Sequence, residues 1–174
     1  MKRIIVVLML VMSSFVCFAQ ITRNIWGLEL GKSTKQQIIN VLKQKGFNPT
    51  IDDVTNTISV KAGNFNFGGG LWTYASFMLY EGRLYEVWFQ NNEYELPVAI
   101  FVQFNKIKEA LDKKYGQYRY TSTENDSENE RAYFDGNTRF HLSRRIYNNV
   151  GYISITYSDD YLLNKKLNGE QDEL

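Results

Sequence analysis

The chain has 174 residues, of which 20 are lysine or arginine and 19 are aspartate or glutamate. This length normally forms one domain that can bury a hydrophobic core without covalent links. The near balance of charge does not indicate a protein that captures nucleic acid or anionic lipid by electrostatic attraction. Aromatic residues make up 15% of the chain, an excess that favours large aromatic surfaces in the core, in an interface or in both.

The beginning of the chain follows the order of an export signal. Lys2 and Arg3 precede an apolar run over residues 4–12, and the small residue Ala19 fits the position before a cleavage site. Serines interrupt the apolar run before it reaches the roughly 20 residues that a membrane span needs. We therefore predict a signal peptide over residues 1–19, cleavage after Ala19, and a mature protein that starts at Gln20 in the periplasm or outside a bacterial cell.

The single cysteine, Cys17, leaves with this signal. The bulky Val16 before it does not fit the lipid-attachment sequence of bacterial lipoproteins, so we expect no membrane association after cleavage. Without cysteine, neither disulfides nor thiolate chemistry can contribute. Cleavage also lowers the basic count from 20 to 18 against 19 acidic residues, so we predict no nucleic-acid partner. Residues 171–174 resemble an endoplasmic-reticulum retrieval signal, and residues 125–127 match a glycosylation acceptor. These two short matches leave open a eukaryotic lumenal protein.

The first predicted helix covers residues 34–45. Ser33 and Gln36 have the spacing of a capping box, and apolar residues then repeat at helical intervals. We expect Gly46 to end this helix in the left-handed conformation, and Pro49 to prevent its continuation.

A predicted hairpin dominates the first half. After a strand from residue 57, two strands over residues 72–80 and 83–90 flank a turn at Glu81-Gly82. A two-residue turn with regular alternation divides the aromatic residues between two faces. One face would hold Trp72, Tyr74, Tyr85 and Phe89, and the other would hold Trp88 beside Glu86 and Gln90.

The second half repeats the order of helix and then strands. A helix is expected from Pro97 to Tyr115, followed by a polar surface loop over residues 124–131. Three strands follow, and in the last two, apolar and polar residues alternate, which predicts one dry and one wet face. The strands cover residues 132–134, 138–144 and 150–158, with turns at Asp135-Gly136 and Asn148-Asn149. After residue 159 we expect only a short helical turn and a frayed end.

These elements predict a single α+β domain over residues 20–174. The order of helix and then antiparallel strands occurs over residues 20–92 and again over residues 93–160, which indicates a weak internal repeat with a tail over residues 161–174.

The stretch from Gly27 to Lys35 reads Gly-Leu-Glu-Leu-Gly-Lys-Ser-Thr-Lys, and the helix after it ends at Lys45-Gly46. This opening resembles that of exported bacterial domains related to the outer-membrane assembly lipoprotein family SmpA/OmlA, although the lipid-attachment cysteine of those lipoproteins is missing. The repeated unit resembles the β-lactamase-inhibitor-protein fold. The resemblance implies a two-layer architecture of two tandem helix-plus-antiparallel-sheet units, and a function in binding other proteins.

Motifs for catalysis are weak. The only histidine, His141, lies on the polar side of its predicted strand without a Gly-x-Ser-x-Gly elbow, and His/Cys zinc ligation cannot be assembled. Gly68-Gly69-Gly70 lacks the Lys-Ser/Thr of a phosphate-binding loop. Asp52-Asp53 and Asp159-Asp160 lack the spacing of a calcium loop. We expect no catalytic residue, no metal and no cofactor, and we expect Arg144-Arg145 to be a solvated strand end.

The aromatic hairpin is the remaining signal for function. A two-layer domain has one helix layer, so one face of the hairpin could stay open to a protein partner or a second copy. Three alternatives remain: coverage of this face by the second repeat, a sugar-binding module that stacks on tryptophan and tyrosine, and a small hydrolase that uses carboxylates or His141. The candidate binding residues are Trp72, Tyr74, Tyr85, Trp88 and Phe89.

Overall fold

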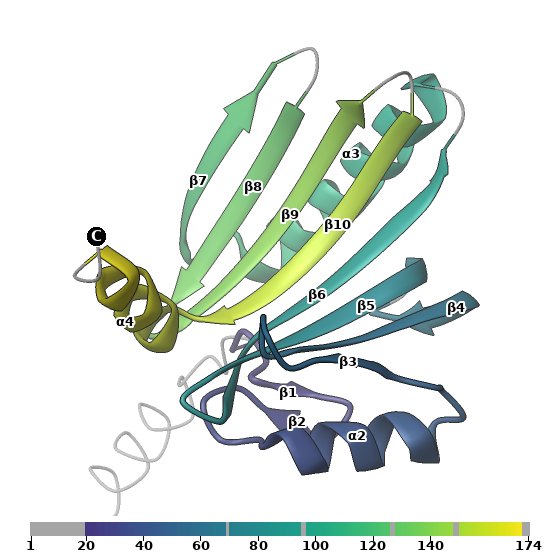
Figure 1. Ribbon diagram of the computed structural model, residues 1–174. Helices are drawn as coiled ribbons and strands as arrows, with labels where there is room; N and C mark the ends of the chain where they lie inside the picture. Colours follow the sequence, from purple (N-terminus) through teal and green to yellow (C-terminus); the bar gives the residue numbers. More distant parts are fainter. Residues whose placement is uncertain (1–19, 69, 95–96, 126–127, 148–149, 172–174) are drawn as a thin grey trace, which may run out of the picture.

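The computed structural model describes residues 20–68, 70–94, 97–125, 128–147 and 150–171. The protein is an α+β protein with a large antiparallel sheet, as its sequence predicts (Figure 1). The expected signal, residues 1–19, lies outside the described residues. Within the described ranges, no helix combines the length and the apolar character that crossing a membrane requires.

The sheet consists of two meanders whose last strands meet at its centre. The strand order is β3-β4-β5-β6-β10-β9-β8-β7, so that β6 and β10 pair antiparallel while β3 and β7 form the edges. The first meander contains β3 (Thr50–Asp52), β4 (Thr57–Phe67), β5 (Gly70–Tyr80) and β6 (Arg83–Tyr94), and the second contains β7 (Arg119–Glu124), β8 (Glu128–Asp135), β9 (Thr138–Tyr147) and β10 (Val150–Asp159).

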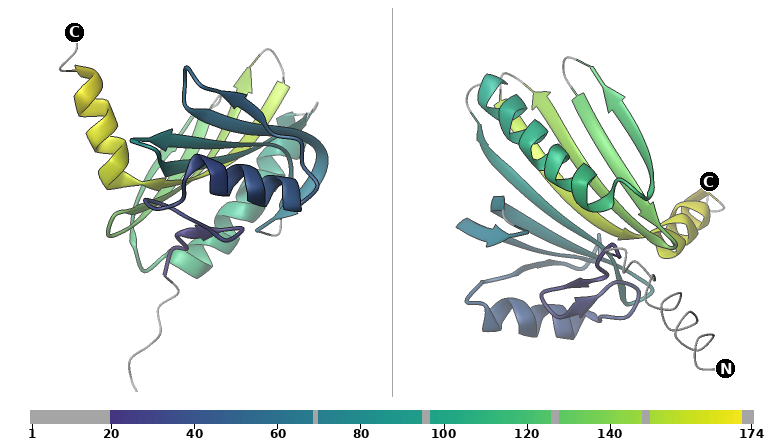
Figure 2. Two further views of the ribbon diagram at one scale, coloured as in Figure 1. Left: turned by 60° about the horizontal axis from the view of Figure 1, so that its bottom comes forward. Right: turned by 180° about the vertical axis from the view of Figure 1, so that it is seen from behind.

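A helix precedes each meander and covers the same face of the sheet. α2 (Lys35–Gln44) lies below the first meander, next to a ribbon of β1 (Asn24–Ile25) and β2 (Leu28–Glu29), and α3 (Pro97–Tyr115) lies across the second (Figure 2). Both helices contribute to one hydrophobic core. A row of buried, mutually paired residues crosses the sheet beneath them: Ile58, Phe77, Val87, Tyr157, Phe140 and Tyr133.

Both predicted helices are present, and the cap of the first is shifted by one residue. Thr34, not Ser33, is the N-cap of α2, and its backbone N–H donates to Oε1 of Gln37 at 2.9 Å. The Ser33 hydroxyl instead accepts a hydrogen bond from the backbone N–H of Glu29 at 2.8 Å. Gly46 has a φ of +81°, which confirms the expected left-handed end of the helix.

The predicted hairpin turn is present, but the predicted faces are wrong beyond it. Tyr80 pairs with Arg83 across Glu81 and Gly82, which both have positive φ. The register then shifts, because Leu79 pairs with Leu84 whereas Met78 pairs with Glu86. A one-residue bulge at Tyr85 exchanges the two faces for the rest of β6. The residues expected to share a face with Phe89 therefore do not all do so, and Tyr74 lies opposite Gln90.

The second meander contains a strand that the sequence did not predict. Residues 119–124 form β7, and β8 begins at Glu128, inside the expected loop over residues 124–131. All six residues of β7 are exposed, as suits an edge strand, so their polarity resembles that of a loop. Gly136, with a φ of +56°, turns the chain between the paired residues Asp135 and Thr138. The expected turn at Asn148-Asn149 lies outside the described residues.

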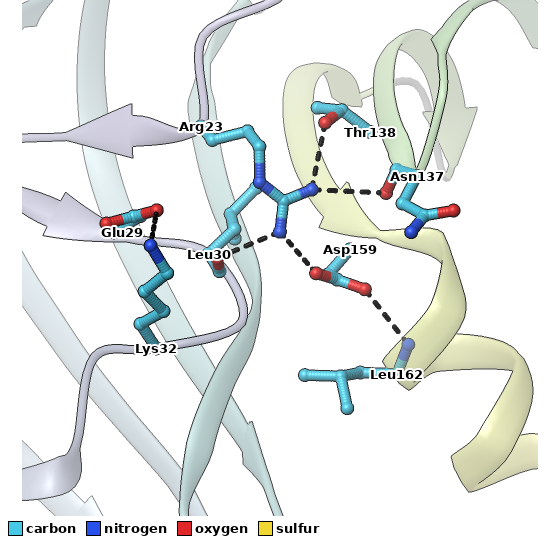
Figure 3. Close-up of polar contacts among 8 residues, drawn as sticks. All are labelled: Arg23, Glu29, Leu30, Lys32, Asn137, Thr138, Asp159 and Leu162. Atoms are coloured by element: carbon cyan, nitrogen blue, oxygen red, sulfur yellow. Dashed lines mark hydrogen bonds and ion pairs between the residues drawn. The ribbon is translucent and has the colours of Figure 1, made fainter.

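Asp159 connects three parts of the chain (Figure 3). Its carboxylate pairs with Arg23 and accepts a hydrogen bond from the backbone N–H of Leu162 at 3.0 Å, which caps α4 (Asp160–Gln171). Arg23 also donates to the carbonyl of Leu30 at 2.9 Å and to the hydroxyl of Thr138 at 3.0 Å. This network fixes the start of the described chain to the end of β10. α4 is a full helix, and not the short turn that we expected.

Candidate binding groove on the open face of the sheet

The sheet face opposite α2 and α3 carries a groove of about 670 Å³ over the central strands. We call it the open-face groove. Its lining comes from β6, β9 and β10, and Figure 1 views the second meander from this side, with α3 behind the strands. The alternate residues of β9 and β10 point to the core and are buried. The predicted dry and wet faces of these two strands are therefore confirmed.

The groove exists because the central strand has short side chains on this face. Ser154, Thr156 and Ser158 of β10 form its floor. The neighbouring strands carry mostly larger side chains at the paired positions, so that β6 and β9 form two walls on either side of β10. The paired rows, each from β6 through β10 to β9, are Glu86-Ser158-Arg139, Trp88-Thr156-His141 and Gln90-Ser154-Ser143.

One end of the groove combines a carboxylate with a guanidinium. The Ser158 hydroxyl donates to Oε2 of Glu86 at 3.0 Å. Burial raises the pKa of Glu86 above its ordinary value, although this hydrogen bond and the charges of Arg139 and Lys166 oppose the rise. Arg139 is held by Asp160 at the start of α4, with 3.2 Å between Nε and Oδ1. Glu86 is the only acidic residue among those that line the groove in the described chain.

His141 lies on the β9 wall beside a carboxylate. Its Nε2 is 3.6 Å from Oε1 of Glu130, which also pairs with Nη2 of Arg145 at 3.3 Å. Burial lowers the pKa of His141, Glu130 opposes this shift, and Arg139 and Arg145 add to it. Burial and the two arginines therefore favour the neutral imidazole over the charged one. Ser143 is the candidate nucleophile nearest to His141 in β9. Its hydroxyl forms a hydrogen bond of 2.8 Å with the hydroxyl of Ser154.

Aromatic side chains border the groove. Trp88 is half-buried on the β6 wall, and its ring meets that of Tyr74 edge to face, with 5.6 Å between centroids. Tyr152 and Tyr147 line the end of the groove away from α4, and Tyr147 is 69% exposed. Aromatic rings next to hydroxyl groups provide both stacking surface and hydrogen-bond partners.

The structure separates the five residues that the sequence proposed for binding. Trp88 lines the groove and Tyr74 supports it. Phe89 and Trp72 are buried on the core side, where their ring centroids lie 6.2 Å apart. Tyr85 is 5% exposed and donates its hydroxyl to the sulfur of Met78. Because of the bulge at Tyr85, the tryptophan that we expected beside Glu86 is the one that remains on the open face.

Sequence reasoning missed the rest of the groove. Ser154, Thr156 and Ser158 at alternate positions predicted a polar face for this strand. The pattern could not predict which strands pair with β10 on its two sides. Glu86 and Arg139 face each other only because β6 pairs with β10, which pairs with β9.

The acidic pairs have structural roles. Asp52 accepts hydrogen bonds from the backbone N–H groups of Val54 and Thr55 at 2.9 and 3.2 Å, and Asp53 pairs with Lys35. Asp159 caps α4 and pairs with Arg23, and Asp160, the first residue of α4, pairs with Arg139. In the part of the chain that the structure describes, no three histidine, cysteine or acidic side chains gather as a metal site.

Comparison of the chain with protein-family models, with curated proteins and with solved structures finds no significant match. What the groove can bind follows from its own chemistry. The floor offers hydroxyl donors and acceptors and the walls offer aromatic surface. Arg139 and Arg145 of β9 are each paired with a carboxylate and add further N–H groups. This combination suits an extended polar ligand with apolar side groups.

Proposed function

We propose that the protein is an exported binding protein that holds an extended segment of a protein partner in the open-face groove. The observation that carries this proposal is the hydroxyl floor of β10 between a wall with Trp88 and a wall with Arg139 and Arg145. From Ser158 to Tyr152 the groove extends over six residue steps of β10, or about 20 Å at the rise of a β-strand. Tryptophan, tyrosine and arginine are the side chains that most often dominate protein interfaces.

The order of the elements supports the same proposal. A helix followed by a four-stranded meander occurs twice, and the last strands of the two meanders pair. A β-lactamase-inhibitor-protein-like architecture of two tandem units would have this arrangement, and the resemblance noted for the sequence implies protein binding. We propose this architecture together with the function.

Carbohydrate binding is the second candidate. Trp88 stands next to Gln90 and opposite Thr156, so a ring that stacks on the indole would meet hydrogen-bonding groups. A glycosidase is less well supported, because hydrolysis requires two carboxyl groups across the substrate. Among the described residues that line the groove, Glu86 supplies the only one.

Selection from a displayed peptide library, followed by calorimetry with the selected peptides, tests the proposal. We expect Trp88→Ala to weaken their binding by at least about 30-fold, the effect of losing a side chain worth about 2 kcal/mol. Thr156→Trp should abolish binding because it fills the floor. Val54→Ser, at a position that is 92% exposed and outside the groove, is the matched control.

A glycan array with the same variants separates the two candidates. Selected peptides that bind equally well to the parent and to Thr156→Trp would place the binding site elsewhere and contradict the proposal. Oligosaccharides that require Trp88, in the absence of any groove-dependent peptide, would favour the carbohydrate function.

A further inference from the structure

A second cavity, of about 350 Å³, lies on the other side of the sheet between α3 and the strands. We call it the α3 cavity. Its inner wall is apolar and aromatic, with Trp72, Phe140, Ile155 and Tyr157 from the strands and Leu111 from α3. The four strand residues are at most 7% exposed. Figure 2 (right) shows α3 lying across the second meander on this face.

The size and lining of this cavity are those of a small-molecule site. Ligand pockets have volumes of about 300–1,000 Å³ and combine apolar walls with a few polar groups. A cavity of this volume could hold several water molecules, each of which needs polar partners. The inner wall offers few such partners, so an apolar ligand is better accommodated there than water.

The inner wall carries a polar group, the hydroxyl of Tyr157. Tyr157 is 7% exposed, and no hydrogen bond joins its hydroxyl to any other described residue. Burial raises the pKa of Tyr157, and the neighbouring Tyr115 adds to the rise, so the phenol stays protonated and can donate. The Tyr157 hydroxyl is therefore a donor on the inner wall that a ligand oxygen could accept.

The mouth of the cavity is positively charged. Lys106 and Lys114 are two of its lining residues, lie on the same side of α3 and are exposed. Neither lysine forms an ion pair with another described residue, and none of the residues that line the cavity is acidic. α3 contains two carboxylates. Asp112 is engaged by Arg131 and Lys108, and Glu109, which does not line the cavity, is exposed three residues after Lys106.

We propose that the α3 cavity binds a small amphiphilic carboxylate, with its apolar body against Trp72 and Tyr157 and its anionic group at Lys106 and Lys114. The positive mouth distinguishes such a ligand from a neutral apolar one, and the apolar inner wall distinguishes it from a free inorganic anion. This site is on the opposite face of the sheet from the open-face groove and does not depend on the function proposed for that groove.

Calorimetric titration of the mature protein with three probes tests the proposal. Decanoate represents a lipid-derived acid, 3-phenylpropanoate represents an aromatic acid, and decanol is the neutral counterpart of decanoate. We expect saturable binding of at least one carboxylate, and tighter binding of decanoate than of decanol if the lipid-derived acid is the ligand. Tighter binding of 3-phenylpropanoate would identify the aromatic class.

Two variants locate the site. Lys106→Gln with Lys114→Gln should weaken carboxylate binding about fivefold, as expected for two solvent-exposed ion pairs, and should leave decanol unchanged. Lys113→Gln, at an exposed lysine of the same helix that is not among the lining residues, is the matched control. Ala110→Trp should block binding, because Ala110 lines the cavity from an exposed position where a larger side chain does not disturb the core.

Three results would overturn the proposal. The first is no saturable binding of either carboxylate. The second is equal affinity for decanoate and decanol, with no effect of the lysine substitutions. The third is full affinity in a folded Ala110→Trp protein, which would place the ligand elsewhere. Circular dichroism establishes that each variant is folded, and the lysine variants decide the outcome if Ala110→Trp does not fold.

Discussion

Ser158 donates its hydroxyl to the carboxylate of Glu86 across the central strand pair, with 3.0 Å between the two oxygens. The two residues are directly paired in the register of β6 and β10. Glu86 therefore lies at the contact between the two meanders. Burial raises the pKa of Glu86 in the folded protein. A raised carboxyl pKa contributes stability below the pKa of the unfolded chain, and this contribution is lost as the pH rises through the folded value.

We accordingly predict that Glu86→Gln is more stable than the parent at pH 7, because the amide keeps an acceptor for Ser158 without a charge. The advantage should vanish below about pH 4, where the carboxyl group is protonated in both states. Urea unfolding across this pH range measures the difference. Glu81 is a control of opposite sign, because a hydrogen bond from Lys165 lowers its pKa, so Glu81→Gln should give no gain at pH 7. Equal curves for Glu86→Gln and the parent would contradict the prediction.

The Arg23 network should contribute measurably to stability. Asp159 is 5% exposed and Arg23 also bonds to Leu30 and Thr138, so Arg23→Met should lower the free energy of unfolding by about 1–3 kcal/mol, the cost of an unsatisfied buried partner. Lys35→Met removes the ion pair with Asp53, which is largely exposed, and should cost less than about 1 kcal/mol. Similar losses in the two variants would show that the network adds nothing beyond a surface ion pair.

The positions of Trp72 in the core and of Trp88 on the open face predict different roles for the two tryptophans. Trp72→Ala should cost about 3–5 kcal/mol, as large aromatic truncations in a core do, because Trp72 is 3% exposed and donates its Nε1–H to the carbonyl of Phe67 at 2.9 Å. Trp88→Ala should cost clearly less, since Trp88 is only half-buried on the open face. Denaturant unfolding of the two variants measures both values, and a reversed order would contradict the assignment of faces.

Gly151 and Ile100 should be energetically coupled. A methyl group added to Gly151 would lie 2.4 Å from Cδ1 of Ile100, at the start of α3. Gly151→Ala should therefore destabilise the protein by about 1–3 kcal/mol through overpacking, and Ile100→Ala by about 2–5 kcal/mol through the cavity that it leaves. The double variant should lose less than the sum, because each change relieves the other. Additive losses would show that the two positions do not share this space.

The sequence predicted the elements better than their faces. Gly46 and Pro97 mark helix ends through backbone chemistry, and the alternation of Phe140 and Leu142 with polar neighbours fixes a strand face, so these local features were predicted correctly. The bulge at Tyr85 was not, because one extra residue in a strand changes no local preference. The register of β6 against β5 decides where the bulge forms.

Arg144 shows the same limit for a single side chain. We expected a solvated strand end, but Arg144 is 4% exposed, donates to Oδ1 of Asn129 at 2.7 Å and lies over the ring of Phe101. A guanidinium can be buried where such partners exist, and both partners come from other elements. The open-face groove could not be predicted for a similar reason, since Glu86 and Ser158 are 72 positions apart.

From the strand order we also expect a particular sequence of events in folding. Each meander can form from contacts between neighbours along the chain, which are fast, whereas the β6–β10 pair closes a long loop and is slow. β10 is the last strand in the chain. Until it docks, β6 is an unpaired edge, and such edges recruit other chains into aggregates. The central strand pair is therefore the step at which nascent chains are most exposed to aggregation, and the open-face groove becomes complete only when that step has passed.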